Sequence, residues 1–185
     1  MGVIMNVGLM SSFLSDINIK RHLDHLREEK LRYSILEKSF PILIDKTPRE
    51  ILRLNIEHRV KQEAFSLACY IKSHECFFNS FNNEIRGNYN CSLTVEKMFY
   101  NMYCDAISRE GCFLFVYVDK NGIPKWSFSK EGNGEFVLFQ PILSIDLYEH
   151  TYFLDYGFDK KRFIRTAISY LDISSLDNLI KKGYN

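Results

Sequence analysis

The stretch "IDLYEHTYFLDYG" (Ile145–Gly157) places an acid and a histidine, Asp146 and His150, four residues apart. It overlaps the apolar run "QPILSI", which is typical of a buried strand. A carboxylate and an imidazole at the end of such a strand both need polar partners, because burying them unpaired costs free energy. The stretch therefore indicates either a hydrogen-bonded structural pair or one half of a metal site.

The composition is that of an ordinary globular protein. The chain has 185 residues, 46% hydrophobic and 25% charged, which suits one domain or two small packed halves. Its net charge of +1 gives no basic field to attract nucleic acid or an anionic membrane. The five cysteines include no CxxC pair, which favours reduced thiols over a disulfide framework or a thiolate zinc site. The first residues lack a basic segment, so we expect a cytoplasmic protein, with a mitochondrial one as the alternative.

The first half of the chain reads as helical. Apolar residues recur with helical spacing from Ser15 to Phe40, and Pro41 ends that pattern. The stretch "DKTPRE" (45–50) then predicts a helix start, followed by a second long helix to about Phe81. A polar, Asn-rich stretch around Gly87 suggests a boundary, so we expect an N-terminal helical hairpin domain over 1–86 and a C-terminal α/β domain over 87–185.

The second half mixes helices and strands. A helix is expected over 93–107, followed by strands over 112–118 and 123–129 that the hairpin signal Asn121-Gly122 joins. The run "FVLFQPILSI" (136–145) suits a third strand, and two helices follow over 159–171 and 174–182. The sequence therefore predicts an α+β fold with a small three-stranded antiparallel sheet.

Other histidines could complete a site with Asp146 and His150. His25 lies on the first predicted helix, and Glu29 and Tyr33 share its face. His74 lies in an apolar run and is expected to be buried. His22 and His58 stand in charged segments and are expected to be solvated. Two or three histidines with one carboxylate suit iron, manganese or zinc, although a buried histidine is more often a hydrogen-bonded structural residue.

Three segments resemble the iron/manganese superoxide dismutase family. "DLYEHTYFLDYG" (146–157) is similar to the family's acid-x-aromatic-Glu-His signature, and "SHECFFNSF" (73–81) is similar to its second-helix motif. On the first helix, His25 stands eight residues before Tyr33, as the family's metal-binding histidine stands before a tyrosine. The order of the predicted elements also matches, so the resemblance covers nearly the whole chain.

The resemblance implies a site, a reaction and a partner. It implies one iron or manganese ion per subunit, with water or hydroxide as a fifth ligand and superoxide as the substrate, and Tyr33 as a catalytic residue at the mouth of the channel. The implied metal ligands are His25, His74, Asp146 and His150. Glu149 resembles a glutamate that reaches a ligand histidine of a second subunit, which implies a homodimer through Glu149 and His150.

The chain departs from the family around the ligands. The family aims a glutamine, or a histidine, at the metal-bound solvent, but Tyr70 stands at the helix position. "SKEGNGEF" (129–136) holds neither residue on the sheet side, with Asn133 the nearest amide. The channel and contact positions hold Glu29 and Phe153. Two other functions therefore stay open: a non-catalytic dismutase-like structural protein, such as a subunit of a larger assembly, and a metal-dependent hydrolase, for which no acid is placed as a general base.

Overall fold

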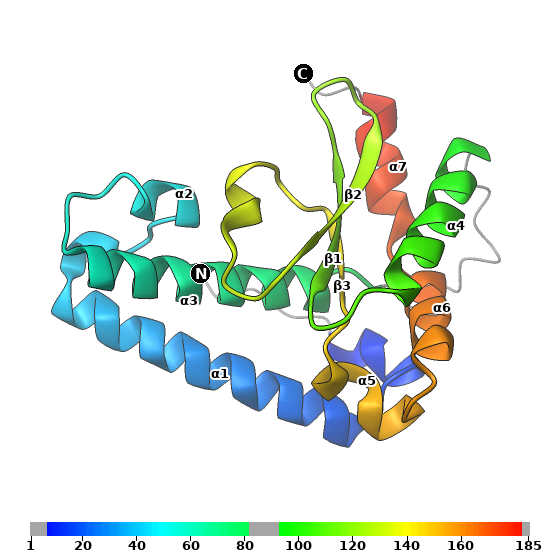
Figure 1. Cartoon of the computed structure of the whole chain (residues 1–185), viewed down its shortest axis with the longest axis horizontal. Helices are drawn as coiled ribbons and strands as arrows, with labels where there is room; N and C mark the ends of the chain where they lie inside the picture. The colour runs from blue at the N-terminus through cyan, green and yellow to red at the C-terminus, as the bar shows by residue number, and fades with distance from the viewer. Residues whose placement is uncertain (1–6, 82–92, 183–185) are drawn as a thin grey trace.

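Two long helices form most of the first half of the chain. A computed structural model describes residues 7–81 and 93–182. Helix α1 (Asp16–Ser39) packs against α3 (His58–Phe78), and both run toward the small sheet (Figure 1). The hydroxyl of Ser15 accepts a hydrogen bond from the Asn18 N–H and caps α1. The predicted first helix is therefore confirmed.

The second helix begins as predicted but is interrupted. Thr47 and Glu50 form a capping box at the start of α2, which is only one turn long (Pro48–Ile51). The chain then turns before α3, and Leu54 packs against a small buried cluster with Leu43 and Ile51. The predicted helix start and the second long helix are therefore both present, with a turn between them that the sequence did not indicate.

Three antiparallel strands form the sheet, in the order β2-β1-β3. Strand β1 (Phe113–Val118) pairs with β2 (Pro124–Ser129) on one side and with β3 (Leu143–Asp146) on the other. At the predicted hairpin turn, Gly122 has a φ of +76°, which glycine adopts without strain. The Asp119 carboxylate accepts hydrogen bonds from two backbone N–H groups of the same turn. The hairpin prediction is confirmed.

The third strand is shorter than the sequence suggested. Gly134–Val137 forms a 3-10 helix, η4, and β3 begins only at Leu143. Pro141 has no N–H to donate to a neighbouring strand, and the pairing with β1 starts with the N–H of Ile142, which bonds to the Val116 carbonyl. The expected strand over 136–145 is therefore confirmed only in its last residues.

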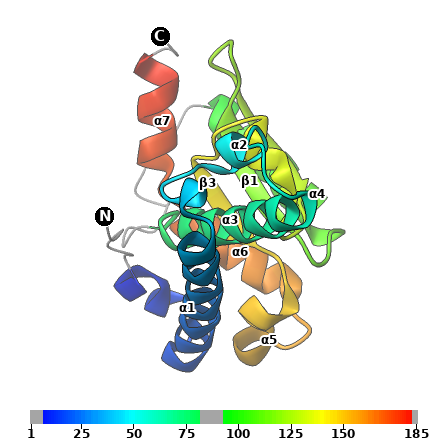
Figure 2. The same ribbon diagram turned by 90° about the vertical axis from the view of Figure 1, so that its left-hand side faces the viewer.

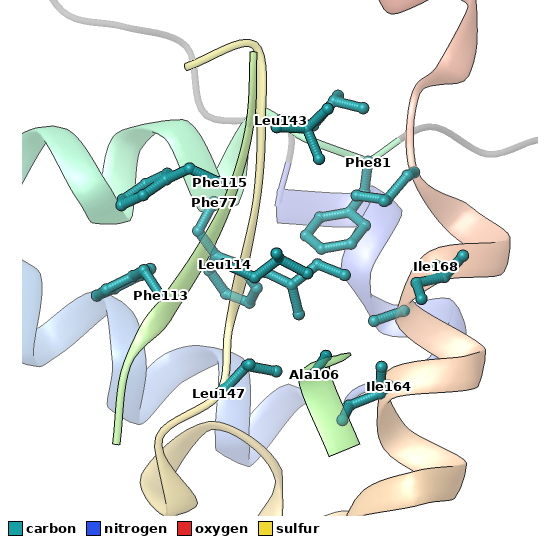
Figure 3. Close-up of a cluster of buried hydrophobic side chains, with 14 of the residues drawn as sticks. Phe77, Phe81, Ala106, Phe113, Leu114, Phe115, Leu143, Leu147, Ile164 and Ile168 are labelled. Atoms are coloured by element: carbon teal, nitrogen blue, oxygen red, sulfur yellow. The ribbon is translucent and has the colours of Figure 1, made fainter. Parts of the chain in front are cut away.

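Helices cover the sheet and close the core. Figure 1 shows the sheet between the two long helices and the remaining helices of the second half. Phe77 from α3, Leu114 from β1 and Ile164 from α6 meet in one buried cluster (Figure 3). These later helices are α4 (Leu93–Ile107), α5 (Glu149–Tyr156), α6 (Lys160–Tyr170) and α7 (Ile173–Lys182). Two further 3-10 helices are η1 (Val7–Ser12) and η2 (Pro41–Leu43). The predicted α+β fold, with long N-terminal helices and a small antiparallel sheet, is confirmed.

The two halves share this core. Leu26 of α1 and Phe77 of α3 belong to the same buried cluster as Leu114 and Ile164, and Figure 2 shows α3 passing beside the sheet. The expected boundary near Gly87 lies outside the described residues, so the division into 1–86 and 87–185 stays a prediction. Among the helices described, none combines the length and the hydropathy of a membrane span.

Candidate metal centre

Four polar side chains converge where α1, α3, β3 and α5 meet. His22 comes from α1, His74 from α3, Asp146 from the last residue of β3 and His150 from the first turn of α5. One potential ligand atom from each lies within 4.8 Å of the others. His22, His74 and Asp146 are buried, and His150 is partly exposed.

The spacing of these atoms suits a single ion. Asp146 Oδ2 lies 3.2 Å from His22 Nε2, 3.4 Å from His150 Nε2 and 3.9 Å from His74 Nε2. Two ligand atoms that are each about 2.1 Å from one ion lie about 3 to 4.2 Å apart, for angles of 90° to 180° between them. All three distances from Asp146 Oδ2 fall within this range, as they would if the carboxylate and each imidazole bound the same ion.

The converging atoms lack other partners. His22 Nε2, His74 Nε2 and Asp146 Oδ2 are buried and have no hydrogen-bond partner of suitable geometry among the described residues. Leaving one such group unsatisfied costs about 1–3 kcal/mol, and more when it is charged. A cation between them would satisfy all three at once, which is the strongest reason to interpret this group as a metal site.

The backbone orients two of the four side chains. His74 Nδ1 lies 3.0 Å from the Tyr70 carbonyl one turn earlier on α3, so its N–H can donate there and leave the Nε2 lone pair facing the centre. The Tyr148 N–H donates to Asp146 Oδ1 at 2.8 Å, which leaves Oδ2 facing the centre. Metal-binding histidines and carboxylates are commonly fixed in this way by a hydrogen bond from their other polar atom.

The protonation states of His74 and Asp146 also suit a cation. Burial lowers the pKa of His74 from 6.5 to about 3, so this imidazole is neutral near pH 7 and can act as a ligand. Burial alone would raise the pKa of the Asp146 carboxyl, but the neighbouring imidazoles of His150 and His22 lower it well below its ordinary range. Burial opposes the charged form of His150 as well, yet the Asp146 carboxylate raises its pKa overall. Asp146 therefore supplies a permanent negative charge at the centre.

Aromatic rings enclose the buried side of the group. Phe77 stacks on His22 with ring centroids 5.3 Å apart, and Phe113 meets the His74 ring edge-on at 5.0 Å. Tyr148 stacks against His150 with ring centroids 5.5 Å apart. These rings keep water from the buried ligand atoms and fix the orientation of the imidazoles.

The structure corrects one position of the expected ligand set. It brings His74, Asp146 and His150 together, but their fourth neighbour is His22 and not His25. α1 turns the face with Ile19, His22 and Leu26 toward the core, and His22 is only 4% exposed, so the expectation that it is solvated was wrong.

His25 lies on the flank of α1, outside this group. Its side chain is 48% exposed, and its ring centroid lies 6.4 Å from that of His150. It lines two surface pockets, one beside His22 and His150 and the other beside Tyr70. His25 therefore stands at the approaches to the group and not within it.

Tyr33 does not lie at the site. It follows His22 by three turns of α1, about 16 Å along the helix axis at 1.5 Å per residue. Its hydroxyl lies 3.5 Å from the Leu43 carbonyl, and its ring packs against the small cluster around Leu43 and Ile51. The catalytic role expected for Tyr33 rested on His25 as the ligand, and the geometry gives it no support.

Glu131 is a site residue that the sequence did not reveal. It lies in the loop between β2 and η4, and its Oε1 atom is 4.0 Å from His74 Nε2. Burial, and then the charge of Asp146, raise the pKa of Glu131 to about 7. Asn133, the nearest amide in the sequence of this loop, is exposed. The side chain that the loop directs toward the centre is therefore an acid.

Tyr70 stands where the family places a glutamine on the second helix. Its ring lies against His74, with centroids 4.1 Å apart. Its hydroxyl is buried without a hydrogen-bond partner in the described residues, and burial raises its pKa far above the ordinary value. Tyr70 is therefore a neutral residue beside the centre.

The comparison with protein families agrees with the geometry. Residues 78–178 match the family model described as iron/manganese superoxide dismutases, C-terminal domain. This match covers more than half of the chain and includes Asp146, His150 and Glu131. A search among curated proteins finds no match.

Proposed function

Because the chain belongs to the iron/manganese superoxide dismutase family, we propose that it disproportionates superoxide to dioxygen and hydrogen peroxide at one iron or manganese ion. The residues that would hold this ion are His22, His74, Asp146 and His150. The observation that carries the proposal is the convergence of four ligand atoms, three of them buried without another partner.

The donor set suits these two metals. Imidazole and carboxylate are borderline to hard donors, which favour iron, manganese and zinc over metals that prefer thiolates. A bound iron or manganese ion would supply the one-electron oxidation and reduction that disproportionation of superoxide requires. The Asp146 charge would stabilise the oxidised state of the ion, and His74, neutral because it is buried, would bind without adding positive charge.

The residues around the group give the substrate two approaches. The first pocket is lined by Arg21, His25 and Glu149 beside the partly exposed His150. The second is lined by Arg32 and Tyr70 and includes Glu131. Arginine side chains in both pockets favour an anionic substrate, although Arg32 also pairs with Glu29 at 2.9 Å. His25 lies on both approaches and is suited to carrying protons from solvent toward them.

The proposed homodimer would form around α5. Glu149 and Phe153 are exposed on this helix, and Leu154 beside them is 50% exposed. A second copy seated here would cover these apolar side chains and bring its own Glu149 near His150. Sedimentation or light scattering of the purified chain tests this, and a monomer at micromolar concentration would contradict it.

Two alternatives remain in competition with dismutase activity. An acid at Glu131 in place of an amide favours a non-catalytic, dismutase-like structural protein, because the group that would tune the metal is changed. Glu131 also supplies the acid that a metal-dependent hydrolase would need as a general base. Membership of a redox family favours the dismutase over the hydrolase.

The decisive experiment loads the metal-free chain separately with iron and with manganese and measures metal content and superoxide removal. We expect about one ion per chain and removal of superoxide with at least one metal, both lost in His74→Ala. Bound metal without superoxide removal would favour the structural alternative. A chain that binds neither metal would contradict the site itself.

A further inference from the structure

Glu131 approaches the metal centre with an unsatisfied carboxylate oxygen. Its Oε1 atom is buried and has no hydrogen-bond partner among the described residues, like His22 Nε2, His74 Nε2 and Asp146 Oδ2 nearby. It faces His74 Nε2 at 4.0 Å. These two facing atoms, from α3 and from the loop after β2, are both buried and unsatisfied, and leaving a buried carboxylate unpaired is costly.

The loop that carries Glu131 is held in place. The Glu131 N–H donates to the Tyr148 hydroxyl at 2.9 Å, and Tyr148 also donates its own backbone N–H to Asp146. The next residue, Gly132, lies so close to Ser66 of α3 that a Cβ at this position would collide with the serine hydroxyl. The backbone at Glu131 and Gly132 is thus held by Tyr148 on one side and by Ser66 of α3 on the other.

No cation in the described part of the chain pairs with Glu131. Its one ion-pair distance within 4.0 Å is to His74, which burial keeps neutral. The second pocket contains Arg32, but that side chain pairs with Glu29 and approaches Glu63. The charge of His150 acts on Glu131 only from beyond 4.0 Å, so a metal ion beside His74 would compensate the carboxylate more closely.

We propose that Glu131 is a fifth protein ligand, whose carboxylate occupies the coordination position that the resemblance assigns to water or hydroxide. This inference rests on the proposed metal site. With two carboxylates and three neutral imidazoles, a divalent iron or manganese ion would be neutralised completely. A small anion could then reach the ion only by displacing Glu131, so this side chain controls access to the metal from the second pocket.

Two substitutions and a matched control test this assignment in the full-length chain. Glu131→Gln keeps the shape of the side chain and removes its charge, whereas Glu131→Ala removes the ligand atoms. Glu29→Gln removes an acid from the same pocket but not from the centre. Circular dichroism checks that all three variants are folded. We expect the Glu131 variants to fold, because Glu131 lies in a loop.

The first readout is Mn²⁺ affinity, measured by titrating the metal-free chains. A direct ligand should contribute at least as much as the outer residues of metal sites, so both Glu131 variants should lose about tenfold or more in affinity. Glu29→Gln should bind as the unmodified chain does. Equal Mn²⁺ affinity in the unmodified chain and both Glu131 variants would overturn the proposal.

The second readout is azide binding to the iron(III)-loaded chains, followed by absorption. Azide should bind weakly to the unmodified chain and more tightly to Glu131→Ala, in which the position is open. If azide binds equally tightly to the unmodified chain and to Glu131→Ala, Glu131 does not occupy the fifth coordination position, and the proposal is overturned. Loss of Mn²⁺ affinity together with tighter azide binding in Glu131→Ala supports Glu131 as a ligand, even if the loaded chain removes no superoxide. An unmodified chain that binds no metal overturns both this inference and the proposed function.

Discussion

His22 Nε2 on the first long helix lies 3.2 Å from Asp146 Oδ2 at the end of β3. Both side chains are almost completely buried, at 2% and 0% exposure, although they belong to different halves of the chain. A contact of this kind forms only when α1 packs against the end of the sheet. The fold and the candidate metal centre are therefore formed together, and His22 links them.

The first prediction separates His22 from His25 as metal ligands. His22→Ala should abolish stoichiometric binding of iron or manganese, because it removes one of the four converging atoms. His25→Ala should leave the metal content close to that of the unmodified chain, because His25 lies outside the group. Metal analysis after gel filtration measures both. The reverse result, with metal lost only in His25→Ala, would show that the ligand set inferred from the resemblance was right and the geometry misleading.

Local signals in the sequence were enough to predict most of the fold. The spacing of apolar residues gave α1, and Asn121-Gly122 gave the hairpin, because each depends on residues close in sequence. The turn after α2 could not be predicted in this way. It exists because Leu54 packs on Leu43 and Ile51, and that contact depends on how the segments meet in space.

The same distinction applies to the site. Asp146, His150 and His74 could be identified because each lies in a distinctive apolar or aromatic stretch. Choosing between His22 and His25 required knowing which face of α1 is buried. One signal was available, since His22 stands three residues after Ile19 and four before Leu26, on the same stripe of the helix.

Glu131 had no such signal in the sequence. It lies in a loop without periodicity, and its position depends on contacts with Tyr148 and on the approach of Gly132 to Ser66. Both contacts join segments that are distant along the chain. Only the folded arrangement could reveal it.

The second prediction concerns the pH dependence of stability in the metal-free protein. The pKa of His74 falls from 6.5 to about 3 on folding, so the unfolded chain binds more protons in this window and His74 makes the protein less stable as pH falls. The pKa of Glu131 rises from 4.5 to about 7 on folding, so the folded chain binds more protons in this range. The stability that Glu131 contributes is therefore lost as pH rises through it. The two effects oppose each other between pH 4.5 and 6.5.

Substitutions should separate these opposing effects. Glu131→Gln leaves His74 acting, so the free energy of unfolding should rise from pH 4.5 to 6.5, by at most about 1.4 kcal/mol per pH unit. His74→Gln should show the opposite slope. The carboxyl of Asp146 stays ionised and His150, whose pKa is raised, stays protonated over most of this window. Denaturant unfolding of metal-free samples measures the slopes, and parallel curves for the two variants would contradict the assignment.

The third prediction tests the core beneath the site. Leu114 is a fully buried residue of β1, opposite Phe128 of β2 and Ile145 of β3. Leu114→Ala should lower the free energy of unfolding by about 2–5 kcal/mol, because it leaves a cavity in packed surroundings. Leu138→Ala is the control, since Leu138 is 82% exposed and its loss should change stability by less than about 0.5 kcal/mol. Similar losses for both leucines would mean that the sheet does not form the centre of the core.

The last prediction compares two glycines with the same backbone conformation. Gly122 has a φ of +76° and Gly132 a φ of +72°, so alanine is strained at either position. A Cβ at Gly122 meets nothing within 4 Å, but a Cβ at Gly132 collides with the Ser66 hydroxyl. Gly122→Ala should therefore cost about 1 kcal/mol in the free energy of unfolding, and Gly132→Ala should cost distinctly more.

A double substitution isolates the collision. Ser66→Ala combined with Gly132→Ala removes the hydroxyl that the new Cβ would meet and leaves only ordinary contacts with residue 66, so it should restore the part of the loss that exceeds the Gly122→Ala value. Gly132→Ala should also lower Mn²⁺ affinity, because the collision displaces the loop that carries Glu131. The double substitution should recover this affinity, because the loop can return to its position. Denaturant unfolding and Mn²⁺ titration of the unmodified chain, Gly122→Ala, Gly132→Ala and the double variant measure the two effects. If Gly132→Ala and Gly122→Ala lose equal stability and neither changes Mn²⁺ affinity, the close approach of the loop to α3 does not hold Glu131 in place.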